Sequence, residues 1–188
     1  PFMQEKSNDR FYGLFGITGG ATIKNLGLVN YNIDVSYTGV TEDIIIWAGA
    51  FSGEFNCPDH NKSYDAPGDM ENCYADDGKI SFNVNPAKNS KASISIEVGG
   101  LVGTASLGKI HRCYHGSDIT VKCNSPFYLA GAGIAATIAH LWITECYNTG
   151  SISFPVGDAQ MPSKDSFVGG IVGEVTPNGN INTMGKPK

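Results

Sequence analysis

The sequence lacks any apolar run long enough to cross a membrane, and it carries few positive charges. Its longest weakly polar stretch, Phe127–Ile138, is short and rich in Gly and Ala. The 13 Lys and Arg residues are outnumbered by 18 Asp and Glu residues, which gives a formal net charge of −5 with no basic stripe. These absences argue against nucleic acid or an anionic membrane as the main partner.

The opening residues, PFMQEKSNDR, also lack the apolar segment of a signal peptide. This polar start and the abrupt end, MGKPK, both indicate a piece of a longer protein. We therefore expect residues 1–188 to form a single domain that has flanking domains in a parent protein.

The sequence signatures of common enzymes are missing as well. The chain contains no HExxH, GxSxG, P-loop or dinucleotide-binding motif. Its five cysteines are an odd number, and they form neither a CxxC pair nor a cluster with zinc-binding spacing. We expect a chain that is not an enzyme and that has no resident cofactor.

What the sequence does contain is an internal repeat of three short motifs. The first motif is apolar and has glycine second in each copy; it reads YGLFG, AGAFS, GGLVG, AGIAA and GGIVG, with those glycines at Gly13, Gly49, Gly100, Gly133 and Gly170. The second motif reads IKNLG, MENCY, IHRCY, ITECY and INTMG, starting at Ile23, Met70, Ile110, Ile143 and Ile181. The third motif has Ile second in each copy and reads NIDV, KISF, DITV and SISF.

β-Branched and aromatic residues dominate these motifs, and no segment has helical periodicity. One repeat cannot bury its apolar face alone, whereas stacked repeats bury a continuous core. The sequence therefore predicts an all-β fold, a right-handed parallel β-helix (β-solenoid) of about five coils with three short strands per coil. The predicted repeats lie near 11–43, 44–94, 95–128, 129–165 and 166–188.

The pattern GGLVG…CY…G.I resembles the GLUG repeat of large bacterial surface proteins, adhesins and some immunoglobulin A peptidase precursors. The resemblance runs from about Tyr12 to Gly185 and is best in the third and fifth repeats, while the first repeat lacks the CY pair. It implies a secreted or cell-surface repeat region, and usually not the catalytic part of such proteins.

One column of the repeat holds Cys73, Cys113, Cys146, Leu26 and Met184. A position that accepts Cys, Leu and Met is a small apolar core slot, so we expect buried thiols without disulfides. Because Ile110 and Cys113 are three residues apart, both can face inward only if a corner or bulge separates them.

Tyr74, Tyr114 and Tyr147 follow these cysteines, and strand alternation turns their side chains outward as an aromatic ladder. Two interpretations stay open: ladder packing, which cross-strand aromatic pairs favour, and a ligand-binding platform for sugar rings. In the same turns, Arg112 and Glu145 occupy one column of adjacent coils and predict a surface ion pair.

The second repeat carries an insertion loop at residues 53–69, GEFNCPDHNKSYDAPGD. Its oxygen-bearing residues suited to calcium are Asp59, Asn61, Asp65 and Asp69. Their spacing matches an EF-hand only loosely, so a solvated loop is the favoured interpretation and calcium binding is the alternative. Loops that project from a rigid scaffold often carry binding.

These features favour a non-catalytic structural and binding module of a secreted or cell-surface bacterial protein, which adheres to a host surface protein or a polysaccharide. The alternatives are a carbohydrate-binding or carbohydrate-cleaving β-helix and an inert rigid spacer. Uncapped solenoid ends expose unpaired strand edges, so end-to-end self-association is a further expectation.

Overall fold

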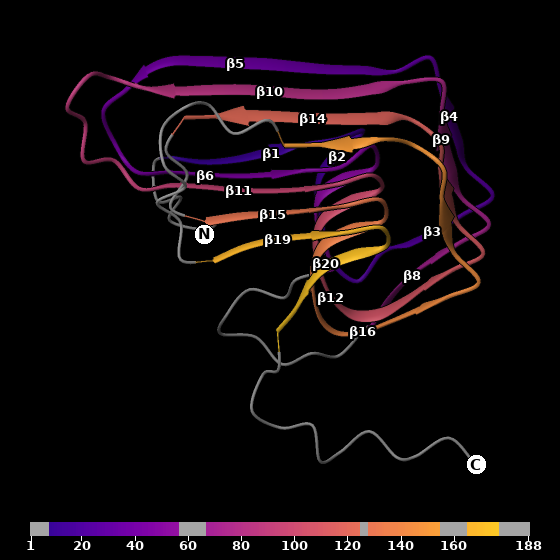
Figure 1. Ribbon diagram of the computed structural model, residues 1–188. Coiled ribbons are helices and arrows are strands. Elements are labelled where there is room, and N and C mark those ends of the chain that lie inside the picture. Colours follow the sequence, from indigo (N-terminus) through magenta and orange to yellow (C-terminus); the bar gives the residue numbers. More distant parts are fainter. Residues whose placement is uncertain (1–7, 57–66, 125–127, 155–164, 177–188) are drawn as a thin grey trace.

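The computed structural model describes residues 8–56, 67–124, 128–154 and 165–176 (Figure 1). Every regular element in these ranges is a β-strand, and every strand pairing is parallel. The chain passes through four sheets in turn and then returns to the first, so strands far apart in the sequence lie side by side. This all-β, parallel arrangement is consistent with the predicted β-solenoid.

We number the sheets in the order in which the chain meets them. The first sheet contains β1 (Asp9–Tyr12), β6 (Ile44–Ala48), β11 (Ile94–Gly99), β15 (Tyr128–Ala132) and β19 (Asp165–Gly169). The second contains β2 (Phe15–Thr18), β7 (Ser52–Phe55), β12 (Val102–His111), β16 (Ala135–Thr144) and β20 (Val172–Val175), with β3 (Thr22–Lys24) and β8 (Gly68–Glu71) paired beside β12. The third contains β4 (Gly27–Val29), β9 (Tyr74–Asp76), β13 (Tyr114–His115) and β17 (Tyr147–Asn148). The fourth contains β5 (Asn32–Val40), β10 (Lys79–Pro86), β14 (Asp118–Cys123) and β18 (Ile152–Ser153).

The fourth sheet follows the third sequence motif directly. Its pairing sets Ile80 beside Ile33 and Ile119, and Ile119 beside Ile152, so the isoleucine of every copy is in register. Each of these positions is inward-facing in an alternating strand, and Ile80 and Ile119 are fully buried. The predicted register of this motif is confirmed.

The glycine-rich first motif is a corner that joins two strands, not a strand. Gly100 and Leu101 separate β11 from β12, so the passage from β11 to β14 has four strands where three were predicted. The pairing also sets Ala48 beside Val98 and Ser52 beside Val102, which places Gly49 level with Gly99. The alignment of Gly49 with Gly100 made from the sequence was therefore wrong by one residue.

Glycine is required where the first and second sheets approach each other behind this corner. A Cβ atom on Gly103 would lie 2.5 Å from the carbonyl oxygen of Gly53 and 2.6 Å from the backbone nitrogen of Ala48. Because both neighbours are backbone atoms, a side chain there would push the two sheets apart.

The second motif contains the corner that the spacing of Ile110 and Cys113 required. The residue before the column position has a left-handed φ in each described copy, between 50° and 54°, at Asn25, Asn72, Arg112 and Glu145. As a result Ile110 and Cys113 both point inward, with exposures of 0% and 1%. The prediction of a corner between them is confirmed.

A further bend lies inside the second sheet, at Leu107 in β12 and His140 in β16, and the motifs did not reveal it. The insertion of the second repeat falls at this bend, since Phe55 pairs with Ala105 and Gly68 with Gly108. The insertion therefore begins after Phe55 and ends before Gly68, so the predicted bounds 53–69 included strand residues at both ends.

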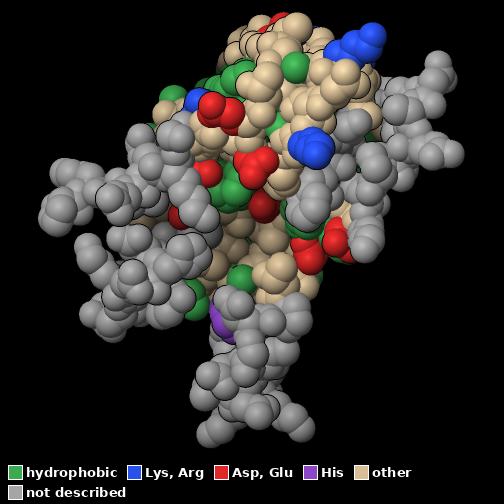
Figure 2. Space-filling model, turned by 90° about the vertical axis from the view of Figure 1, so that its left-hand side faces the viewer, with side chains coloured by type: hydrophobic (Ala, Val, Ile, Leu, Met, Phe, Trp, Pro, Cys, Tyr) green, Lys and Arg blue, Asp and Glu red, His purple; other side chains and the backbone are tan. Residues whose placement is uncertain are grey.

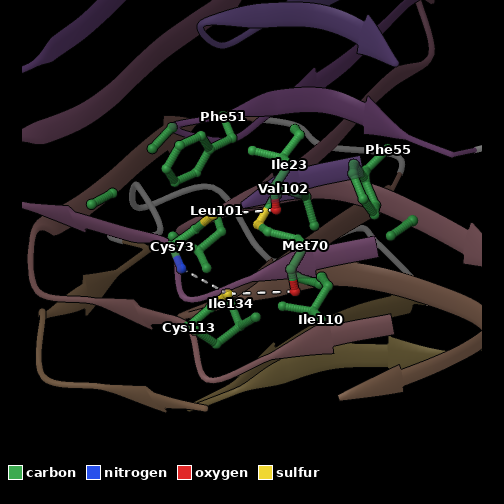
Figure 3. Packing of buried hydrophobic residues seen from close by; sticks show 14 of the residues in the cluster. Ile23, Phe51, Phe55, Met70, Cys73, Leu101, Val102, Ile110, Cys113 and Ile134 are labelled. Atoms are coloured by element: carbon green, nitrogen blue, oxygen red, sulfur yellow. Dashed lines mark hydrogen bonds between the residues drawn. The ribbon is translucent and has the colours of Figure 1, made fainter. Parts of the chain in front are cut away.

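Two apolar clusters fill the interior. One packs the first sheet against the fourth, with Ile46 and Ile96 facing Ile80, Phe82 and Ile119. The other lies against the second and third sheets and is drawn in Figure 3; its members include Phe55, Met70, Leu101, Ile110 and Ile134. Each fully buried large side chain contributes about 1.5–3 kcal/mol. The core uses the inward faces of the strands, which leaves the outward rows for function.

Candidate functional site

The cysteines of the repeat belong to the core. Cys73, Cys113 and Cys146 are free thiols, and the first two are buried. The Sγ of Cys113 accepts a hydrogen bond from the backbone N–H of Cys73 at 3.4 Å (Figure 3), and the Sγ of Cys146 accepts one from Cys113 at 3.4 Å. Hydrogen bonding to the two neighbouring thiols, together with burial, raises the pKa of Cys113, so this thiol stays protonated. The expectation of buried thiols without disulfides is confirmed for Cys73 and Cys113, while Cys146 is a free thiol that is only partly buried. Cys57 and Met184 lie outside the described residues.

The predicted tyrosine ladder forms on the third sheet. Tyr114 pairs in register with Tyr74 and Tyr147, and its ring stacks on theirs at centroid distances of 5.2 and 5.1 Å with interplanar angles of 4°. Tyr74 and Tyr147 are 38% and 54% exposed. The ladder itself is thus as predicted, while its binding of sugars stays a prediction.

The ladder packs its rings face to face. Both faces of Tyr114 are covered by the neighbouring tyrosines, and the ring of Tyr74 also lies across Gly27, which leaves room for it by having no Cβ. The Tyr114 hydroxyl donates to Oδ2 of Asp76 at 3.1 Å. A sugar ring stacks on an aromatic face, and both faces of Tyr114 and Tyr74 and one face of Tyr147 are covered, so the ladder is better suited to structural packing.

A buried histidine lies behind the ladder. His115 is fully buried; its Nδ1 is 2.9 Å from Oδ1 of Asn148, and its Nε2 is 3.0 Å from the Tyr31 hydroxyl. The neutral ring satisfies both contacts if Nδ1–H donates to Asn148 and Nε2 accepts from Tyr31. Burial lowers the pKa of His115 and raises that of Tyr31 to about 12, which keeps both groups neutral.

The expected surface ion pair is present. Nε of Arg112 lies 3.4 Å from Oε2 of Glu145, and both side chains are more than half exposed. Beside this pair, Nδ1 of His111 at the end of β12 lies 2.8 Å from the hydroxyl of Thr144 at the end of β16. An exposed pair of this kind contributes little to stability.

Calcium binding by the insertion stays a prediction. Asp59, Asn61 and Asp65 lie outside the described residues, while Asp69 lies in β8, where it pairs in register with Lys109. Within the ranges that the structure covers, no group of three or more His, Cys, Asp or Glu side chains is placed to hold a metal ion.

The outward rows of the first and second sheets hold a group of side chains that the sequence did not single out. In the first sheet the row is Phe11, Trp47, Glu97, Ala130 and Phe167. In the second it is Ile17, Glu54, Thr104, Thr137 and Glu174. Figure 2 shows carboxylate side chains gathered on this side of the molecule, around a recess. We call the group formed by Trp47, Glu97, Tyr128, Thr137 and Glu174 the acidic corner.

Hydrogen bonds join the two sheets across the acidic corner. The Tyr128 hydroxyl of β15 donates to Oε2 of Glu174 in β20 and lies 3.3 Å from the Thr137 hydroxyl in β16. On β6, the Trp47 indole N–H donates to Oε1 of Glu97 at 2.9 Å. The other carboxylate oxygen of Glu97, Oε2, is shielded from solvent and has no hydrogen-bond partner among the described residues.

Burial and like charge govern the chemistry of Glu97. Desolvation raises its pKa, the Thr137 hydroxyl and the Trp47 indole oppose that rise, and the negative charge of Glu174 adds to it. Burial, followed by the hydrogen bond to Glu174, also raises the pKa of Tyr128. A buried carboxylate with an unused oxygen is a strong acceptor for any donor that enters the corner.

Sequence reasoning missed this group because its members belong to different motifs. Glu97 and Glu174 lie in different sheets, so neither shares a repeat column with the other, and a search for stacked carboxylates passes over them. The detectable signal was the alternation in IIIWA and ISIEV, where Trp47 and Glu97 stand between inward-facing residues.

No family model, curated protein or solved structure was found to match this chain. None of the described residues forms a helix long and apolar enough to span a membrane.

Proposed function

We propose that the chain is a right-handed β-solenoid of about five coils that serves as a non-catalytic binding module of a secreted or cell-surface bacterial protein and attaches to polysaccharide. The resemblance to GLUG repeats motivates the location and the scaffold role. The acidic corner motivates the ligand, and it is the observation on which the proposal rests.

The composition of the corner suits a saccharide better than an apolar ligand. Trp47, which stacks on Phe11 with one face, and Tyr128 offer half-buried aromatic surface, while Glu97, Glu174 and Thr137 offer acceptors and a hydroxyl beside them. Polysaccharides combine apolar C–H surfaces with closely spaced hydroxyl donors, and binding sites of this kind place a few polar groups among aromatic side chains. Because each row runs across successive strands, the surface is extended, as a linear polymer requires.

A glycan array with three proteins tests this proposal. The unmodified chain should bind at least one polysaccharide, and Trp47→Ala should lose that binding. The triple variant Tyr74→Ala, Tyr114→Ala, Tyr147→Ala should retain binding wherever it remains folded, as judged by circular dichroism. Loss of binding in the folded ladder variant alone would move the site to the third sheet, and binding of no glycan by the unmodified chain would favour the inert spacer.

Polysaccharide cleavage is the second candidate, and one observation favours it. A general acid must stay protonated near neutral pH, and the burial of Glu97 raises its pKa in that direction. Glu174 supplies a second carboxylate across the corner. Release of new reducing ends from a bound glycan, abolished in Glu97→Gln, would establish cleavage; binding without such release supports the non-catalytic proposal.

A further inference from the structure

The unused oxygen of Glu97 indicates which saccharides the acidic corner selects. Oε1 of Glu97 is occupied by the Trp47 indole, while Oε2 is shielded and has no partner in the part of the chain that the structure describes. Leaving a buried acceptor unsatisfied destabilises the folded chain. A site of this kind gains free energy when a ligand brings a donor to that oxygen.

The electrostatics of the corner favour a cationic donor over a neutral one. The charge that acts on Glu97 comes from Glu174, which is also negative, and Glu54 lies in the same outward row as Glu174. The hydrogen-bonding groups between the two carboxylates, Tyr128 and Thr137, are neutral hydroxyls. An incoming positive charge would relieve the repulsion between the carboxylates, which a neutral hydroxyl cannot do.

The number of ligands argues for an ammonium group and not for a metal ion. Calcium takes six to eight oxygen ligands, and the corner offers two carboxylates whose oxygens are partly occupied by Trp47 and Tyr128. An ammonium group has three donors and needs only a few acceptors. Glu97 Oε2 with an oxygen of Glu174 or Thr137 provides such a set.

We propose that the acidic corner binds amino sugars that carry a free amine, with Glu97 Oε2 as the acceptor for the ammonium group. This inference rests on the proposed polysaccharide-binding function and narrows it to one substrate class. Glu97 is then a specificity-determining residue, because the amine distinguishes a deacetylated sugar from its N-acetylated counterpart.

Isothermal titration calorimetry with two matched probes tests the inference. The probes are β-1,4-linked glucosamine oligomers and N-acetylglucosamine oligomers of equal length, used in mildly acidic buffer so that the free amines are protonated. We expect the deacetylated oligomer to bind at least about tenfold more tightly. If both oligomers bind equally, amine selection is wrong while the polysaccharide proposal stands; if neither these oligomers nor any glycan on the array binds, the proposed function fails as well.

Two variants that each remove one carboxylate, and so have the same net charge, show whether amine selection depends on Glu97. Glu97→Gln keeps the side-chain shape and an oxygen for Trp47 but removes the charge, so binding of the deacetylated oligomer should fall by at least about tenfold. Glu145→Gln removes an exposed carboxylate at the turn after β16 and should leave affinity within about twofold. Equal losses in both variants would show non-specific attraction to an acidic protein and would overturn the inference, as would unchanged binding by Glu97→Gln.

Proton release supplies a readout that a merely structural role would not change. Burial raises the pKa of Glu97, and a bound ammonium group should lower it again, so binding should move protons from Glu97 to the buffer at pH values near that pKa. The binding enthalpy of the unmodified chain should therefore depend on the ionisation enthalpy of the buffer. That dependence should disappear in Glu97→Gln, and its persistence there would contradict the assignment of the acceptor.

Discussion

Truncation of the central tyrosine should destabilise the chain more than truncation of a terminal one, because Tyr114 stacks on two rings and Tyr147 on one described ring. Aromatic pairs contribute about 0.5–1.5 kcal/mol each beyond the area they bury. The hydrogen bond from Tyr114 to Asp76 adds about 1 kcal/mol. We therefore expect Tyr114→Ala to lower the free energy of unfolding by about 2–4 kcal/mol and Tyr147→Ala by about 0.5–1.5 kcal/mol.

Equilibrium unfolding in urea, followed by circular dichroism, measures both losses. Tyr114→Phe keeps both ring contacts and removes only the hydroxyl, so it should cost about 1 kcal/mol. A double-mutant cycle between Tyr74 and Tyr114 should give a coupling energy of the size of one aromatic pair. Equal costs for Tyr114→Ala and Tyr147→Ala, with no coupling, would refute the view that the ladder is held together by ring stacking.

Three further predictions concern the corner glycines and the buried titratable groups. Gly103→Ala should lower the free energy of unfolding by about 1–3 kcal/mol, because its Cβ would meet backbone atoms. Gly170→Ala should leave the free energy of unfolding nearly unchanged, because no atom lies within 4 Å of the added Cβ. Similar urea midpoints for the two variants would contradict this prediction. His115 has a lowered pKa, so the unfolded chain takes up a proton first as the pH drops, and the stability of the folded chain should fall below about pH 6.5. This loss of stability should be absent in His115→Gln. If the pH profile of unfolding is the same in His115→Gln and in the unmodified chain, the prediction is wrong. Glu97 has a raised pKa, so the unfolded chain loses this proton first as the pH rises, and the stability of the folded chain should fall above about pH 4.5. In thermal unfolding, Glu97→Gln should be more stable than the unmodified chain by a margin that grows as the pH rises above about 4.5. A Glu97→Gln variant that is less stable than the unmodified chain at neutral pH would contradict this prediction.

Much of the fold could be read from the residues because a repeat multiplies a weak local signal. The isoleucine of the third motif and the tyrosine that follows the cysteine of the second recur at positions that pair in register, so each copy supports the others. The tyrosine ladder followed from strand alternation once the cysteines were placed inward. Turn details were less accessible, as the one-residue error at Gly49 shows, because corners accept insertions without disturbing the strands.

The acidic corner lay beyond such reasoning for a physical reason. Periodicity states which face of its own strand a residue occupies, and for Trp47 and Glu97 it correctly indicates the outward face. Periodicity does not indicate which residues of another sheet face Trp47 and Glu97. That depends on the angle between the first and second sheets, whose backbones approach each other closely at positions such as Gly103.

By itself, then, the sequence determined the all-β character of the chain, the register of its second and third motifs and the burial of Cys73 and Cys113, because these depend on residue type and spacing alone. Only the tertiary structure decided that the ladder tyrosines cover one another's faces and that Glu97 retains an oxygen with no partner in the described residues. Both outcomes arise from side chains that different strands bring together, and contacts of that kind are absent from any single strand.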